Sequence, residues 1–253
     1  MINNKKKYDI KILNLSLGTP ANNPVKSDPM VRAVEEAMKA GIVVVVAAGN
    51  SGPDSKTILS PGNSPSAITV GAVDDRKAKA ESAYTIAPFS SRGPTKEGLR
   101  KPDVVAPGVS IKSLANGEGF KTLSGTSMAT PVVSGSLALL LSQNKDLSPK
   151  ELKSQIMKSS VSLNDRHDNQ GAGVVNLSKL FGKVSEEETP KRARPVRRSR
   201  PARRTRPTKQ KPESKPLPIS VIPSESADVK EQSIMTDGLI ILLFLILILI
   251  RVI

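Results

Sequence analysis

The apolar residues in the first part of the chain form short runs that alternate with segments of helical periodicity. The run at 10–17 is rich in Ile and Leu. The run at 42–48 is apolar throughout, as is typical of a strand buried on both faces of a sheet. Between them, Asp28 and Pro29 start a segment with helical spacing of its apolar residues, and Gly41 ends it. Strand, helix and strand in this order predict a βαβ unit of a parallel sheet.

The same alternation continues to about residue 182. Further strands are predicted at 67–73 and 103–108, and a long helix is predicted after Ser127. A second helix is predicted within 147–160, where Ser148, Pro149 and Glu151 have the order of a capping box with proline in the first turn. Residues 1–182 are therefore predicted to form one α/β domain with a parallel sheet.

Residues 183–237 differ sharply in composition. They are rich in Pro, Arg, Lys, Ser and Glu and contain no aromatic residue, which predicts a disordered linker. Three hexads, RARPVR, RSRPAR and RTRPTK, follow one another over residues 192–209, and a six-residue period returns each proline to one side of a polyproline II helix. Such a basic segment is either a solubilising spacer or a surface for anionic lipid or nucleic acid. The lack of aromatic residues for base stacking makes nucleic acid an unlikely partner.

The net charge of +15 is concentrated in this linker. Residues 1–182 contain 23 Lys and Arg against 15 Asp and Glu, whereas residues 191–216 contain 12 against a single Glu.

Residues 238–253 are predicted to form a short C-terminal membrane anchor, because residues 238–250 are apolar and uncharged. Sixteen helical residues would span about 24 Å, which is short of the hydrocarbon core of about 30 Å unless Arg251 reaches the far interface. The alternative is an interfacial or aggregation-prone tail. The basic linker would keep the preceding domain on the cytoplasmic side, and the first residues do not resemble a signal peptide.

Ser127 is the candidate nucleophile. It lies in "LSGTSMATP", directly before an apolar helical run. The alternative is a helix N-cap, since serine is a preferred capping residue. Asn50 follows the buried run at 42–48, at the sheet edge where open α/β domains bind ligands, and its amide could donate to an oxyanion together with the backbone N–H of Ser127. The run that ends at Gly18 would reach the same edge and could pair with an extended peptide.

Several stretches, in this order, resemble subtilisin-like serine proteases: SLG (16–18), AAGNSGP (47–53), SPGNSPSAITVGAVDD (60–75), FSSRGPT (89–95), KPDVVAPGVSI (101–111) and GTSMATP (125–131). The resemblance covers most of residues 9–177. It implies a three-layer subtilisin-like fold, endopeptidase activity on polypeptides, and calcium binding as in several members. By the same resemblance Ser127 is the nucleophile and Asn50 the oxyanion-hole donor. The substrate-binding residues it implies are Ser16, Leu17 and Gly18 on one strand and Ala47, Ala48 and Gly49 in a wall of the primary specificity pocket.

The chain departs from the family pattern before Ser16. The family's catalytic Asp and His motifs precede the SLG strand, and neither Asp9 nor any histidine here lies in such a motif. The single histidine, His167, lies far downstream and is expected to be an exposed loop residue. Absence of cysteine excludes a thiol nucleophile and thiolate metal sites.

These observations predict the carboxyl-terminal part of a subtilisin-like peptidase domain, amino-terminally incomplete and inactive as it stands. The alternatives are a non-catalytic membrane-tethered peptide-binding protein and, on the arginine hexads alone, a nucleic-acid-binding protein.

Overall fold

The computed structural model describes residues 1–78 and 83–182. The helices are η1 (Ile2–Asn4), α1 (Lys5–Tyr8), α2 (Pro29–Lys39), α3 (Thr126–Gln143), α4 (Pro149–Ser159), α5 (His167–Gln170) and α6 (Leu177–Leu180). The strands are β1 (Ile12–Leu15), β2 (Val43–Ala47), β3 (Ile68–Asp74), β4 (Thr85–Ile86), β5 (Val104–Pro107), β6 (Ile111–Leu114) and β7 (Phe120–Leu123).

Four parallel strands form the centre of the domain, in the order β1-β2-β3-β5. β1 pairs with β2 from Ile12 opposite Val43, and β5 pairs with β3 from Val104 opposite Val70. The short β4 adds an antiparallel pair at the end of β3. The prediction of a parallel α/β sheet is confirmed, and each predicted strand is present.

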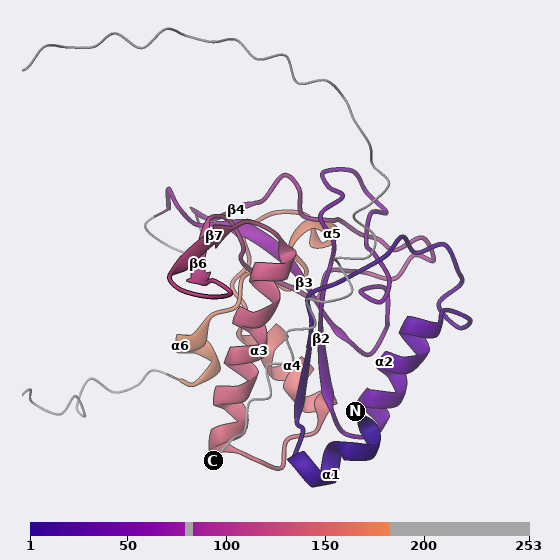
Figure 1. Ribbon diagram of the computed structural model, residues 1–253. Coiled ribbons are helices and arrows are strands. Elements are labelled where there is room, and N and C mark those ends of the chain that lie inside the picture. The colour runs from indigo at the N-terminus through magenta and orange to yellow at the C-terminus, as the bar shows by residue number, and fades with distance from the viewer. Residues whose placement is uncertain (79–82, 183–253) are drawn as a thin grey trace, which may run out of the picture. The chain divides into compact units, whose positions relative to one another are not determined.

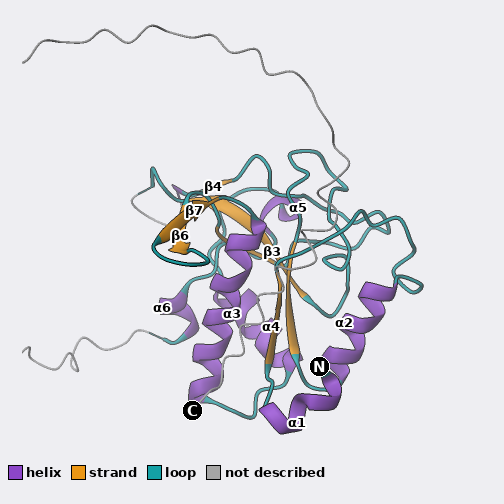
Figure 2. Ribbon diagram, viewed as in Figure 1, coloured by secondary structure: helices purple, strands orange, loops and turns teal. Residues whose placement is uncertain are grey.

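Helices cover both faces of this sheet (Figures 1 and 2). Successive residues of β2 alternate between the faces, as the two-residue period of a strand requires. Val43 and Val45 belong to the core that includes α3 and α4, whereas Val44 and Val46 belong to the core that includes α2. All five residues of β2 are buried, which confirms that a continuous apolar run marks a strand covered on both sides.

Two helices begin as their sequences predict. The side chain of Asp28 accepts hydrogen bonds from the backbone N–H groups of Met30 and Val31 at the start of α2. Ser148 and Glu151 form both bonds of a capping box at the start of α4. Each cap satisfies backbone donors that the first turn of a helix leaves without partners.

The sequence interpretation missed the smaller elements. The hairpin of β6 and β7, β4, and the short helices η1, α1, α5 and α6 were not predicted. The hairpin strands lie largely exposed, so their residues do not show the apolar pattern of a buried strand.

Two surfaces of the domain are only partly covered. β1 pairs only with β2 among the described residues, and all four of its residues are half-buried. α3 contains apolar residues on every side, yet Val132 and Leu139 on one face are 39% and 53% exposed. Gly135 lies between them on that face, and a β-carbon added there would meet no atom within 4 Å.

The linker at 183–237 and the apolar segment at 238–253 lie outside the described residues, so both stay predictions from the sequence. Among the residues that are described, no helix has the length and hydropathy needed to cross a bilayer.

Candidate active site

Ser127 is the second residue of α3, and Gly125 is the N-cap without a side-chain cap. The alternative interpretation of Ser127 as an N-cap is therefore wrong. Its hydroxyl donates to the carbonyl oxygen of Ser16 at 3.3 Å, and the Ser16 hydroxyl donates to the carbonyl oxygen of Ser127 at 2.9 Å. These reciprocal bonds bring the helix start and the end of β1 together, as expected from the resemblance.

Asn50 lies beside the same helix start. Its side-chain oxygen accepts hydrogen bonds from the backbone N–H of Thr126 at 2.9 Å and from the Thr126 hydroxyl at 3.0 Å. A backbone N–H can only donate, so the amide oxygen must face Thr126 and the amide nitrogen must face away. The nitrogen of Asn50 is thereby left to donate to another group.

Thr126 is a functional residue that the sequence interpretation missed. It is buried, and its hydroxyl also accepts a hydrogen bond from the backbone N–H of Gly49 at 3.3 Å. Thr126 thus links the end of β2, the side chain of Asn50 and the start of α3. Its place directly before Ser127 in the GTS motif was the available signal, but a motif does not show which partner a hydroxyl binds.

The arrangement provides two hydrogen-bond donors near Ser127. One is the amide nitrogen of Asn50, and the other is the backbone N–H of Ser127, which lies in the first helical turn where such groups have no intrahelical acceptor. Donors placed in this way stabilise negative charge that develops on a carbonyl oxygen during acyl transfer.

Two short segments flank the site. Ser16, Leu17 and Gly18 are exposed beyond the end of β1, and Ala47 and Ala48 are buried at the end of β2, followed by Gly49. Gly49 has a φ of 112°, a conformation that favours glycine. The structure therefore places the two segments expected to bind substrate next to each other and next to Ser127.

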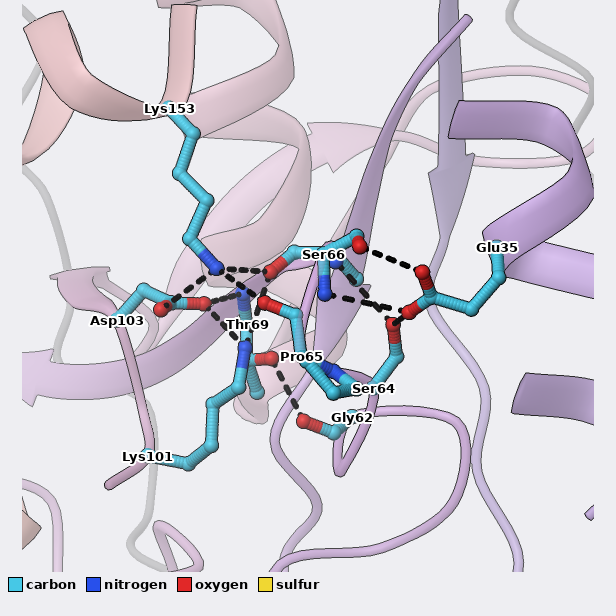
Figure 3. A network of polar contacts seen from close by, with 10 residues as sticks. Glu35, Gly62, Ser64, Pro65, Ser66, Thr69, Lys101, Asp103 and Lys153 are labelled. Carbon is cyan, nitrogen blue, oxygen red and sulfur yellow. Dashed lines mark hydrogen bonds and ion pairs between the residues drawn. The ribbon is translucent and has the colours of Figure 1, made fainter. Parts of the chain in front are cut away.

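A buried polar cluster holds the segment between β2 and β3 (Figure 3). Lys101 and Lys153 bind the carboxylate of Asp103 at 2.6 Å and 3.0 Å. Both lysines also donate to the carbonyl oxygen of Ala67. Burial lowers the pKa of Lys101 to about 8, and the adjacent Asp103 offsets this effect only in part.

Glu35 of α2 holds the other side of this segment. Its carboxylate accepts hydrogen bonds from the hydroxyl of Ser64 at 2.6 Å and from the backbone N–H of Ser66 at 3.2 Å (Figure 3). Burial alone would raise the pKa of Glu35, but the bonds from Ser64 and Ser66 outweigh it and lower the pKa. The loop beside the site is thus tied to α2 on one side and to β5 and α4 on the other.

His167 does not complete the site. It is the first residue of α5 and is exposed, in agreement with expectation. The segment from His167 to Ala172 bonds to Gly93 and to Asp103 next to β5, three strands or about 14 Å across the sheet from β1. Ser127 bonds instead to the end of β1.

No calcium site is evident in the part of the chain that the structure describes. No group of three or more acidic or histidine side chains converges there. Since calcium takes six to eight oxygen ligands, with carboxylates prominent among them, these residues do not identify a calcium site.

Comparison with known proteins defines the class. The sequence profile described as Subtilase family matches residues 1–182. The chain is 50% identical over 184 residues to the serine protease AprX of Bacillus subtilis, covering 66% of this chain and 42% of AprX. It is 38% identical over 170 residues to subtilisin DY of Bacillus licheniformis, covering 66% of this chain and 56% of that protein.

Solved structures agree with these sequence relatives. Sphericase superposes with a TM-score of 0.61 at 32% identity, over 69% of this chain and 60% of that one. The chain therefore belongs to the subtilase family of serine peptidases, and its fold is subtilisin-like. It spans about half the length of the first two curated relatives.

Proposed function

We propose that the chain supplies the nucleophile, the oxyanion hole and one substrate-binding strand of a subtilisin-like serine endopeptidase. The observation that carries this proposal is the fixed orientation of Asn50. Two bonds from Thr126 hold its amide oxygen, so its nitrogen is presented beside the helix start that bears Ser127. Membership of the subtilase family supports the same reaction.

In this reaction the Ser127 oxygen attacks the carbonyl carbon of a peptide bond and loses its proton to a base. The carbonyl oxygen becomes an oxyanion that accepts hydrogen bonds from Asn50 and from the Ser127 backbone N–H. The base then donates the proton to the leaving amine. A water molecule repeats the sequence on the acyl-enzyme and releases the second product.

The base is proposed to come from a polypeptide segment that adds to β1. Among the described residues the Ser127 hydroxyl donates only to the Ser16 carbonyl, which cannot take its proton. The edge of β1 that has no partner among the described residues could pair with such a segment. A strand added there would approach Ser127, because the end of β1 bonds to Ser127, and a segment that follows the strand could cover Val132 and Leu139 on α3.

The test is covalent labelling of Ser127 with a fluorophosphonate probe, which reacts with activated serines. The full chain alone should label slowly. Addition of the amino-terminal part of a subtilase domain, which contains the family's Asp and His motifs, should increase labelling and produce peptide hydrolysis.

Ser124→Ala is the matched control, because Ser124 is an exposed serine of the same loop. It should keep the labelling that Ser127→Ala removes. Labelling that persists in Ser127→Ala would contradict the assignment of the nucleophile.

A non-catalytic peptide-binding protein is the second candidate, and the bond from Ser127 to a backbone carbonyl favours it. Under this alternative the chain would bind extended peptides at the end of β1, and no added segment would produce labelling or hydrolysis.

The remaining proposals concern partners. We propose that residues 238–253 anchor the chain in a membrane and that the arginine hexads add attraction to anionic lipid. Full chain that only detergent releases from vesicles would support an anchor, whereas release by high salt would leave the hexads as the only contact. Calcium binding stays a proposal from the family, to be tested by calorimetry.

A further inference from the structure

Leu59 occupies the space between the two segments that flank Ser127. A β-carbon added at Gly18 would lie 3.0 Å from Cβ and 3.2 Å from Cδ1 of Leu59. A β-carbon added at Gly49 would lie 2.6 Å from Cγ and 2.8 Å from Cδ1 of the same leucine. One side chain therefore packs against both segments and fills the space between Gly18 and Gly49.

The backbone on both sides of Leu59 holds this side chain in place. The Leu59 N–H donates to the carbonyl oxygen of Ala48 at 3.0 Å. Ser60 and Thr19 exchange two backbone hydrogen bonds of 2.9 Å, which tie the next residue to the opposite wall. Leu59 is half-buried, so part of its surface stays accessible to solvent.

The segment that follows Leu59 is equally constrained. Thr69 donates to the carbonyl oxygen of Gly62 at 2.7 Å, and the Lys101–Asp103–Lys153 cluster and Glu35 bind the residues after it (Figure 3). A loop anchored at this many points does not move aside easily to admit a larger group. Leu59 is therefore held in place between Gly18 and Gly49.

We propose that Leu59 closes the primary specificity pocket and restricts the substrate to small residues, such as Ala, Gly or Ser, on the amino side of the cleaved bond. This inference rests on the proposed function, because it assigns the substrate class of that site. An aromatic side chain buries about 150–250 Å² and needs a cavity of matching size. In a pocket that is already packed, extra volume forces strain on its surroundings.

The kinetic test compares peptides that differ only in having Ala, Leu or Phe before the cleaved bond, with the full chain in the complex described above. Wild-type protein should cleave after Ala with a kcat/KM about 100-fold above that for Phe, since each excess methylene alone costs 10-fold or more. Leu59→Gly should shift the Phe-to-Ala ratio by at least about 100-fold toward Phe. Leu59→Ala should give a smaller shift in the same direction.

Leu147→Ala is the matched control. Leu147 is also a half-buried leucine, but it lies beyond the far end of α3, about 24 Å of helix away from Ser127. It should lose comparable packing and leave the Phe-to-Ala ratio unchanged. Cleavage after Phe by wild-type protein as efficient as after Ala would overturn the proposal, as would an unchanged ratio in both Leu59 variants.

A second measurement does not depend on catalysis. In the full chain alone, labelled with ¹⁵N-glycine, p-cresol should shift the amide resonances of Gly18 and Gly49 in Leu59→Gly and should not shift them in wild type, because deletion of the side chain that fills the space between these glycines opens an apolar cavity. Shifts in both proteins, or in neither, would contradict closure by Leu59. Shifts in the variant alone, with no hydrolysis in any complex, would support closure and reject the proposed endopeptidase activity instead.

Discussion

The interior of the sheet and its β1 side are made from similar residues but are covered very differently. β2 and the middle of β3 are fully buried between α2 and α3, whereas β1 is half-buried and has one paired edge among the described residues. α3 belongs to both regions. Its residues Val133 and Leu137 are fully buried against the sheet, and its residues Val132 and Leu139 are exposed.

The difference shows which surfaces remain available for further packing. A helix that is apolar on all sides is typical of the interior of a larger domain, and an open parallel strand offers a row of unpaired backbone groups. Ser127, the proposed nucleophile, lies at the end of β1, where its hydroxyl bonds to the Ser16 carbonyl. The edge of β1 that is unpaired within the described part of the chain is therefore the place where we expect a segment that activates Ser127 to bind.

The largest expected effect is on turnover. Its absence would contradict the difference between the covered interior of the sheet and the β1 side. The full chain alone should hydrolyse peptides poorly or not at all, because among the described residues the Ser127 hydroxyl bonds only to a backbone carbonyl, which cannot act as a base. In a subtilisin, loss of the catalytic histidine costs about 10⁶ in kcat, a magnitude measured in that relative and not calculated from this chain. Steady-state assays with a fluorogenic peptide measure it.

Strong hydrolysis by the chain alone, removed by Ser127→Ala, would show that the chain already supplies a base to Ser127. His167→Ala would then identify whether the exposed histidine serves that purpose.

The next effect concerns the oxyanion hole in the complex that restores activity. Asn50→Ala should lower kcat by about 10²–10³ and leave KM nearly unchanged, because the amide binds the charged intermediate better than the neutral carbonyl. Asn50→Asp should be worse, since a carboxylate would face the developing negative charge. A rise in KM alone would assign Asn50 to ground-state binding.

Thr126→Val tests the positioning of Asn50 at the boundary of the two regions. It removes the hydroxyl bond to Asn50 and keeps the backbone bond, so kcat should fall less than in Asn50→Ala. Thr126→Ser, which restores the hydroxyl, should recover most of kcat. If Thr126→Val matched wild type, the side-chain bond would have no role in catalysis.

A smaller effect is expected at the exposed face of α3, and it tests whether this face is a docking surface. Leu139→Lys should reduce aggregation of the chain alone, measured by light scattering, because it places a charge on an open apolar face. The same change should weaken assembly with the amino-terminal part by about 2 kcal/mol, or about 30-fold, since a buried leucine contributes that much. Leu177→Lys on α6 is the control, because Leu177 is 44% exposed and lies on another helix. Equal effects of both variants would contradict a specific docking face.

The smallest effect lies in the covered region. Because the folded pKa of Glu35 is below its usual value of 4.5, its contribution to stability is present above about pH 4.5 and is lost as pH falls through the lower folded pKa. Glu35→Gln should lower the free energy of unfolding by about 1 kcal/mol at pH 7, and the difference from wild type should shrink in acid. Urea unfolding at several pH values measures it, with exposed Glu36→Gln as the control. A difference that does not change with pH would exclude ionisation of Glu35 as its cause.

The covered region could be predicted from the sequence because its pattern reflects its environment. Val43 to Ala47 are all apolar because both faces are buried, and Asp28 and Ser148 mark helix starts because their side chains serve backbone donors. The exposed hairpin of β6 and β7 has no such constraint, so its sequence did not predict it.

The candidate site was predictable only as a set of residues. The motifs brought together Ser16, Asn50 and Ser127, and the structure places them in contact or on adjoining segments. The sequence did not reveal that Thr126 orients Asn50, nor that Leu59 reaches both Gly18 and Gly49. Such contacts depend on side-chain directions from distant segments, and no local pattern encodes them.

The bond from Thr126 to Asn50 has a consequence for the timing of the chemistry. The amide nitrogen of Asn50, the proposed oxyanion donor, is oriented by Thr126 of this chain, independently of any group that would take the proton from Ser127. If the proposed function holds, binding of the transition state and activation of the nucleophile are thus separate properties. We therefore expect the chain to bind a tetrahedral anion more tightly than a planar carbonyl, even where no base activates Ser127.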